Sequence, residues 1–200
     1  MRVAVADYGA GNLRSLCAAL ARAGAEPFVT TDADDVRGAT LAIVAGVCHV
    51  ASAAARLARS GVADALRERA GDGRPVLGIC VGMQLFFEES EEGGAGLGLL
   101  AGPVTRLQAR RVPHMGWNTL VVSAGTELLG GLDDADVYFA HSYSVRPHDA
   151  SVTVAEVEHD GPVVAAVEHD ALAGVQFHPE RSGTAGARVL ANALRWSRSA

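Results

Sequence analysis

The sequence predicts an α/β protein, a three-layer fold in which a central, mostly parallel sheet carries helices on both faces. The first observation is a set of short apolar stretches with the length of buried strands, at residues 2–7, 26–31, 41–45 and 75–79. The second is that the segments between most of them have apolar residues at helical spacing. Strands that alternate with helices are joined by right-handed crossovers, which give a parallel sheet covered on both sides.

The expected helices begin after the loop at residues 8–12. There Leu13, Leu16 and Leu20 recur at helical spacing, and Gly24 is a suitable stop. The other expected helices cover residues 51–59, 62–70, 83–88 and 184–197.

The second half of the chain predicts antiparallel or mixed additions to the sheet, because its strand-like stretches are joined by short turns. These stretches are residues 104–107, 120–122, 137–140, 152–158, 163–168 and 173–177. Within them, Val-Glu-His-Asp occurs twice, at 157–160 and 167–170. We interpret this repeat as two strand ends with polar turns rather than as a duplicated site.

Composition predicts one globular domain over residues 1–200, since 49% of the residues are apolar and 20% are charged. A net charge of −6 excludes a simple basic nucleic-acid binder. No signal peptide and no apolar run long enough for a membrane span is visible, so we expect a cytoplasmic protein. Three irregularly spaced cysteines predict neither a disulfide framework nor a zinc site, and we expect no metal and no cofactor.

The segment Gly78-Ile79-Cys80-Val81-Gly82 has the pattern of a nucleophile elbow with cysteine in place of serine. A sharp strand-to-helix turn exposes such a nucleophile, and the flanking glycines relieve the crowding of the backbone. A helix N-terminus favours the thiolate, and the N–H of Val81 would point to a developing oxyanion. The alternative is a buried apolar cysteine at the end of a strand.

The segment His178-Pro179-Glu180 provides a candidate base and a carboxylate to orient it. In an extended backbone, residues i and i+2 share a side, so Glu180 can reach the imidazole of His178 and leave the other nitrogen free to take a thiol proton. Of the seven histidines, only His178 combines a strand end, a rigid proline and an acid at i+2. The alternative is an ion pair in a surface turn, which stabilises little.

Two other patterns are weaker. Gly9-Ala10-Gly11 after the first strand is similar to a dinucleotide-binding loop, but Arg14 occupies the position of the third glycine. Cys48-His49 is an adjacent pair whose side chains diverge, so a working dyad is not expected there.

Several motifs in order along the chain resemble the class I (triad-type) glutamine amidotransferases, and among them the glutaminase subunits of imidazole glycerol phosphate synthases. The elbow around Cys80 and the His178-Pro179-Glu180 segment are common to many amidotransferases. The more specific motifs are Asp7-Tyr8-Gly9-Ala10-Gly11-Asn12-Leu13-Arg14-Ser15, Ser90-Glu91-Glu92, Gly96-Leu97-Gly98, Val112-Pro113-His114-Met115-Gly116-Trp117-Asn118, His141-Ser142-Tyr143 and Gly174-Val175-Gln176-Phe177.

The resemblance implies that Cys80 attacks the side-chain amide of glutamine, that His178 moves the proton and that Glu180 orients His178. It implies an oxyanion site at the N–H groups of Val81 and of Gly46-Val47. It also implies that glutamine is positioned by Gln84, His141, Ser142 and Tyr143. The ammonia would pass to a cyclase subunit in a heterodimer, which makes imidazole glycerol phosphate and an aminoimidazole carboxamide nucleotide in histidine biosynthesis.

The chain departs from the pattern of this family at four positions, the first being Ala45, which replaces the proline of the usual Pro-Gly-Val-Gly loop. Cys48 stands in the oxyanion loop where the family usually has glycine, Arg181 replaces lysine, and Val81 replaces leucine. Two alternative functions are a different amidotransferase, which would lack the segment around Trp117, and a catalytically inactive binding module on the same fold.

Overall fold

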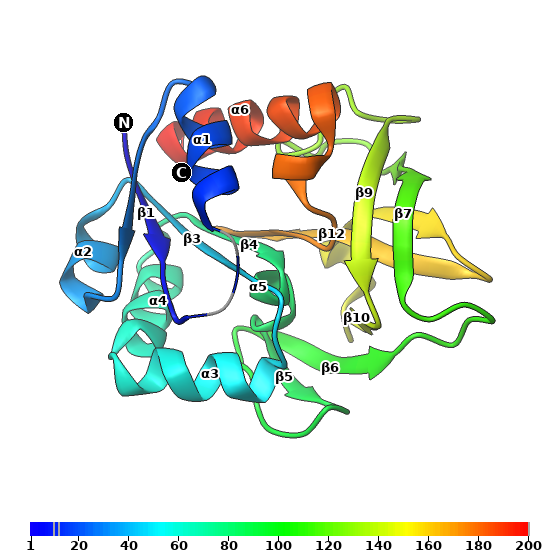
Figure 1. The fold of residues 1–200 in the computed structure, drawn as a ribbon, viewed down its shortest axis with the longest axis horizontal. Coiled ribbons are helices and arrows are strands. Elements are labelled where there is room, and N and C mark those ends of the chain that lie inside the picture. Colours follow the sequence, from blue (N-terminus) through cyan, green and yellow to red (C-terminus); the bar gives the residue numbers. More distant parts are fainter. Residues whose placement is uncertain (10, 12, 200) are drawn as a thin grey trace.

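The computed structural model describes residues 1–9, 11 and 13–199, and it shows a large sheet between two layers of helices (Figure 1). Helices α1 (Leu13–Arg22) and α6 (Gly183–Ser199) cover one face, and α3 (Val50–Arg59) and α4 (Val62–Gly71) cover the other. The expected three-layer α/β fold is confirmed. Ala10 and Asn12 of the predicted N-terminal loop lie outside the described residues.

The large sheet has eight strands in the order β2-β1-β3-β4-β13-β12-β11-β8. Its parallel half consists of β1 (Arg2–Ala6), β2 (Glu26–Thr30), β3 (Leu41–Gly46), β4 (Val76–Cys80) and β13 (Leu172–Val175). The antiparallel half consists of β12 (Pro162–His169), β11 (Thr153–Glu158) and β8 (Val121–Val122). Residues on β3 and β4 are all buried, as expected for strands that are covered on both faces.

Two smaller sheets stand beside the large one. One has the order β10-β6-β5, formed by β10 (Tyr143–Val145), β6 (Leu100–Arg106) and β5 (Phe87–Ser90). The other is an antiparallel ribbon of β7 (His114–Thr119) and β9 (Asp136–His141), in which His114 is opposite His141 and Trp117 is opposite Tyr138. In Figure 1 this ribbon lies at the end of the molecule away from α2 (Ala33–Gly38).

The helix expected over residues 83–88 is wrong. Helix α5 covers only Val81–Gln84, and the chain continues as strand β5 from Phe87. The apolar run before Glu88 fits either structure, and pairing of Phe87 with Leu100 on β6 selects the strand. Neither α2, which Asp32 caps through a bond from the Asp34 N–H, nor β7 was expected.

Other boundaries differ by a few residues. The expected strand at 173–177 ends at Val175, and a 3₁₀ turn at Pro179–Arg181 follows. The two Val-Glu-His-Asp segments end in turns at which Asp160 and Asp170 have positive φ angles of 55° and 48°. These turn conformations support their interpretation as strand ends. No helix within the described residues is long and apolar enough to cross a membrane.

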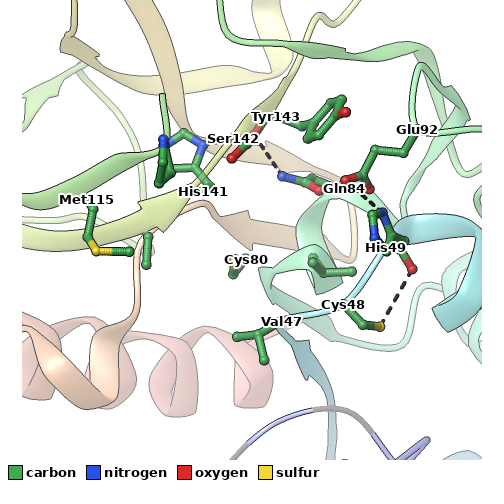
Figure 2. Close-up of a pocket in the computed structure, with 13 residues that line it drawn as sticks. Val47, Cys48, His49, Cys80, Gln84, Glu92, Met115, His141, Ser142 and Tyr143 are labelled. Atoms are coloured by element: carbon green, nitrogen blue, oxygen red, sulfur yellow. Dashed lines mark hydrogen bonds and ion pairs between the residues drawn. The ribbon is translucent and has the colours of Figure 1, made fainter. Parts of the chain in front are cut away.

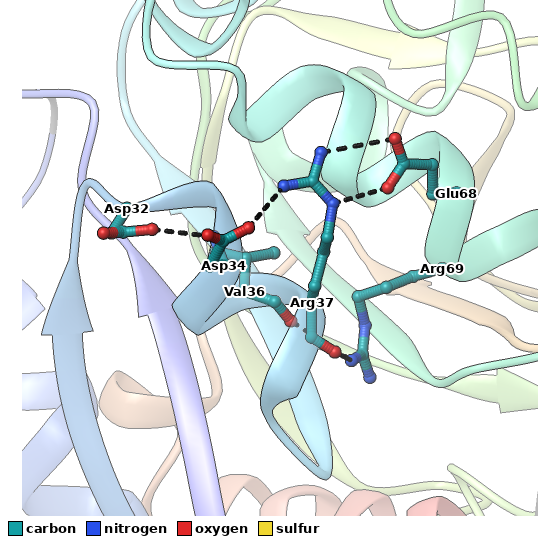
Figure 3. A network of polar contacts seen from close by, with 6 residues as sticks. All are labelled: Asp32, Asp34, Val36, Arg37, Glu68 and Arg69. Atoms are coloured by element: carbon teal, nitrogen blue, oxygen red, sulfur yellow. Dashed lines mark hydrogen bonds and ion pairs between the residues drawn. The ribbon is translucent and has the colours of Figure 1, made fainter.

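A buried arginine joins α4 to the ends of α2 and β3 (Figure 3). Arg69 is only 1% exposed, and its guanidinium donates hydrogen bonds to five backbone carbonyls. These are the carbonyls of Val36, Arg37, Ala39, Thr40 and Pro75. Burial, with a smaller contribution from Arg74, lowers the pKa of Arg69 to about 10, so the group stays charged at neutral pH. The neighbouring Arg37, by contrast, pairs with Asp34 and Glu68 on the surface.

We expect Arg69→Met to lower the free energy of unfolding by about 3 kcal/mol, because it leaves buried carbonyls without donors. Urea denaturation followed by circular dichroism measures this change. Arg37→Met is the matched control in the same network, and its loss should be much smaller because its ion pairs are exposed. Equal losses for the two variants would contradict the structural role of Arg69.

Candidate active site

Cys80 ends β4 in a strained conformation, with φ 56° and ψ −111°. A non-glycine residue rarely has a positive φ, and it persists only where the surrounding structure fixes it. A Cβ atom on Gly78 would lie 2.6 Å from the Gly82 carbonyl carbon, and one on Gly82 would lie 1.9 Å from the Val44 oxygen. The turn therefore requires both glycines, and the predicted elbow geometry is confirmed.

The helix after the elbow is shorter than expected. Because α5 has only four residues, from Val81 to Gln84, its dipole is small and contributes little to the electrostatics at Cys80. Val81 is the first residue of this turn, so its N–H is one of the donors that the turn leaves without an intrahelical partner.

His178 is held beside Cys80 by a compact turn. Its Nδ1 lies 3.0 Å from Glu180 Oε1, and both side chains are largely buried. Ser182 fixes the backbone, since its hydroxyl donates to the His178 carbonyl at 2.7 Å and accepts the Tyr138 N–H at 2.9 Å. The predicted His178–Glu180 contact is confirmed, but through the 3₁₀ turn rather than through an extended backbone.

The electrostatics of this pair favour a protonated imidazole. Burial lowers the pKa of His178, but the Cys80 and Glu180 side chains outweigh burial and raise its pKa from 6.5 to about 10. Glu180 occupies Nδ1, so the pairing with Cys80 uses Nε2, which has no other hydrogen-bond partner among the described residues. The arrangement therefore keeps the His178 imidazole protonated beside the Cys80 sulfur at neutral pH.

A pocket of about 230 Å³ opens at Cys80 (Figure 2). This volume is below the roughly 300–1,000 Å³ of sites for drug-sized ligands and suits a small metabolite. The pocket is lined by Val47, Cys48, His49, Cys80, Val81, Gln84, Glu92, Pro113, Met115, Ala140, His141, Ser142 and Tyr143. Seven of the ten residues predicted for catalysis, the oxyanion site and glutamine binding meet here. Gly46, His178 and Glu180 line instead a small adjoining cavity of about 30 Å³.

Both ring nitrogens of His141 are engaged by hydrogen-bond partners. Its Nδ1 lies 2.8 Å from the Tyr143 carbonyl, and its Nε2 lies 3.0 Å from His114 Nδ1. Burial lowers the pKa of His141 to about 3 and that of His114 to about 4, so both imidazoles are neutral at physiological pH. Their hydrogen bonds hold the Ser142-Tyr143 segment against the pocket.

Sequence reasoning missed two residues of the site. Gln176 is fully buried, and its Nε2 lies 3.6 Å from Cys80 Sγ. Glu92 lines the pocket, where its Oε1 lies 3.0 Å from His49 Nδ1 and its Oε2 accepts the Val50 N–H. Both belong to motifs that were quoted for the family resemblance, but neither motif indicated the contact.

Comparison with known proteins shows the family of the chain. The family described as "Glutamine amidotransferase class-I" matches residues 4–196. The chain belongs to this family. One relative is the imidazole glycerol phosphate synthase subunit HisH from Geobacillus thermodenitrificans. It is 43% identical over 197 residues, which cover 94% of this chain and 92% of the relative. The subunit HisH from Mycobacterium bovis is 46% identical over 196 residues, or 95% of each chain.

Solved structures of this class share the fold. A structure described as glutamine amidotransferase covers 98% of both chains with a TM-score of 0.80 at 22% identity, and PurLQS from Thermotoga maritima gives 0.74 at 22%. The HisH relatives confirm the resemblance drawn from the motifs and identify the chain as an enzyme of the amidotransferase class, with a role in histidine biosynthesis.

Cys48 places a second thiol at the pocket, and its sulfur donates towards the His49 carbonyl at 3.6 Å (Figure 2). Burial raises the pKa of Cys48, against a smaller opposing effect of Arg56. A side chain at this position also restricts a loop in which glycine would move freely.

We expect Cys48→Gly to keep the chemistry but to change both its activation and its sensitivity to oxidation. The measurement is glutamine hydrolysis with and without a partner subunit, before and after brief peroxide treatment. Cys17→Ser, on helix α1 away from the pocket, is the control. Identical kinetics and identical inactivation in the Cys48→Gly variant and the unmodified chain would rule out a role for Cys48.

Proposed function

We propose that this chain hydrolyses glutamine to glutamate and ammonia through a Cys80-His178-Glu180 triad, and that it works as the glutaminase subunit of an imidazole glycerol phosphate synthase. The observation that carries the proposal is the placement of His178 between Glu180 and Cys80, the residue at which the pocket opens. The shared family and the HisH relatives support it. The whole chain acts as one domain in this proposal.

The proposed reaction has two stages. The Cys80 thiolate attacks the side-chain amide carbon of glutamine, the carbonyl oxygen becomes an oxyanion, and protonated His178 gives its proton to the departing ammonia. Water then attacks the glutamyl thioester, with His178 taking its proton, to release glutamate and the thiol. The N–H groups of Val81 and of the Gly46-Val47 loop are the candidate oxyanion donors, because both segments lie beside Cys80.

The polar groups of the pocket match the two ends of a glutamine molecule. Both amide hydrogens of Gln84 are engaged, one by the Tyr143 carbonyl and one by Gln176. Its side-chain oxygen is therefore the atom that can accept a hydrogen bond from a substrate. Among the described residues that line the pocket, Glu92 alone carries a carboxylate, which suits the α-ammonium group. We assign Gln84, Glu92 and the His141-Ser142-Tyr143 segment to glutamine binding.

An exposed apolar surface beside the pocket supports a partner subunit. Val47, Met115 and Trp117 are 65%, 66% and 58% exposed, and two of them also line the pocket. Trp117 packs edge-on against Tyr138 at 6.0 Å, and the Arg181 guanidinium lies 4.1 Å from the centre of the Tyr138 ring. Exposed aromatic and arginine side chains are typical anchors of interfaces. We propose the cyclase subunit as this partner, and the cytoplasm as the location.

The decisive experiment is glutamine hydrolysis by the chain alone and with its cyclase plus a cyclase ligand. We expect low activity alone, a strong increase with the liganded cyclase, and a loss of at least about 10³-fold in Cys80→Ala. High activity of the chain alone would indicate a stand-alone glutaminase. A folded chain that binds the cyclase but is inactive in both conditions would favour an inactive binding module.

We further expect Trp117→Ala to weaken cyclase binding by at least about tenfold, roughly 1.4 kcal/mol, because it removes an exposed aromatic anchor. Isothermal titration calorimetry measures the affinity. Val29→Ala is the control, since Val29 is also exposed but lies on β2, the edge strand at the other end of the large sheet. Unchanged affinity in Trp117→Ala would place the interface elsewhere.

A further inference from the structure

We propose that Gln176 is a further catalytic residue, whose side-chain amide donates a hydrogen bond to the Cys80 sulfur and stabilises the thiolate. This inference rests on the proposed function, because it concerns the same nucleophile. It assigns a role to a fully buried polar side chain that the triad does not explain.

The sheet places Gln176 beside Cys80. Strands β13 and β4 are parallel neighbours, with Gly174 opposite Gly78 and Val175 opposite Ile79. Gln176 directly follows Val175, and Cys80 directly follows Ile79. The two residues therefore lie side by side where the strands end. The Gln176 N–H donates to the Ala165 carbonyl at 2.8 Å, which continues the sheet bonding through this residue. The contact is therefore set by the backbone and does not depend on a flexible loop.

A chain of hydrogen bonds fixes which end of the Gln176 amide faces the sulfur. The Tyr143 carbonyl can only accept, so it takes a hydrogen from Gln84 Nε2 at 2.9 Å. The other hydrogen of Gln84 Nε2 goes to Gln176 Oε1, also at 2.9 Å. The oxygen of Gln176 is thus occupied, and its NH₂ group is directed at Cys80 Sγ, 3.6 Å away. This polarity suits an anionic sulfur, since the amide offers a donor.

The environment of Cys80 makes such a donor useful. The four-residue α5 supplies little dipole stabilisation, and Nε2 of His178 contributes one partner. A hydrogen bond to a charged group is stronger than one to a neutral group and favours the charged form. A buried amide with only a structural role would be expected to bond to backbone carbonyls. Asn192 does so, because its Nδ2 donates to the carbonyls of Leu128 and Gly130.

The same series of hydrogen bonds connects the substrate pocket to the nucleophile. Gln84 lines the pocket and contacts Gln176, which contacts Cys80. A glutamine molecule that donates a hydrogen bond to the Gln84 side-chain oxygen would polarise these hydrogen bonds in series. It would thereby strengthen the bond that Gln176 donates to the sulfur.

The test is the pH dependence of Cys80 alkylation by iodoacetamide, followed on the Cys80 peptide by mass spectrometry in the full chain. Two variants separate the contributions. Gln176→Glu keeps an acceptor for Gln84 but replaces the donor to sulfur with a carboxylate oxygen, and Gln176→Met removes both contacts at similar size. We expect the alkylation midpoint to move upward by about one pH unit in Gln176→Met, a roughly tenfold loss of thiolate below the midpoint, and further in Gln176→Glu.

Asn192→Leu is the matched control, a buried amide lost away from the site. It should lower Tm and leave the alkylation midpoint unchanged. If Gln176→Met and Gln176→Glu also lower Tm without moving the midpoint, Gln176 is structural and the inference is overturned. If one variant fails to fold, the other still decides. A Cys80 in the unmodified chain that alkylates no faster than Cys17 would instead contradict the proposed triad, so the two failures are distinguishable.

Discussion

Three parallel strands end level in the middle of the large sheet, and the site depends on this register. Gly46 of β3 is opposite Cys80 of β4, and Val175 of β13 is opposite Ile79, one residue before Cys80. Backbone pairing alone therefore brings together the Gly46-Val47 loop proposed to hold the oxyanion, the proposed nucleophile Cys80 and the proposed donor Gln176. A slip of one residue would turn each side chain to the other face of the sheet. Close packing on both faces of these strands prevents it.

The rigid sheet also supports a strained backbone and a buried ionic pair, both of which are energetically unfavourable, at the carboxyl ends of its central strands. The backbone of Cys80 at φ 56° costs on the order of 1–3 kcal/mol, and the tight turn around it is possible because Gly78 and Gly82 have no side chains to clash with the neighbouring backbone. A buried ionic pair is costly unless hydrogen bonds satisfy its remaining groups. Glu180 on one side of His178 and Gln176 on one side of Cys80 provide such bonds. Strain and charge are thus concentrated where the chemistry needs them.

Local patterns were sufficient to predict β1 to β4 of the parallel half, the elbow at Cys80 and the contact of His178 with Glu180, because each shows in residues close in sequence. The parallel strand β13 was expected only as one of the antiparallel or mixed additions, since its pairing with β4 is set by residues far away in the chain. The segment 83–88 was mispredicted because its apolar run fits a helix or a strand, and only pairing with a distant strand decides. Gln176 could not be found in this way, since its partner Cys80 is 96 residues away. Its role depends on strand register, which one sequence does not encode locally.

Strand β7 relates the pocket to the surface proposed for the partner. Its side chains alternate, so that His114 points inward while Met115 and Trp117 are exposed. His114 bonds to His141, which holds the Tyr143 carbonyl, and that carbonyl is the acceptor that orients Gln84. A partner that covers the outer face of this strand therefore presses on an element whose inner face is hydrogen-bonded to the pocket. The two histidines that link β7 to the Tyr143 carbonyl are neutral at physiological pH, so this connection consists of hydrogen bonds between uncharged groups.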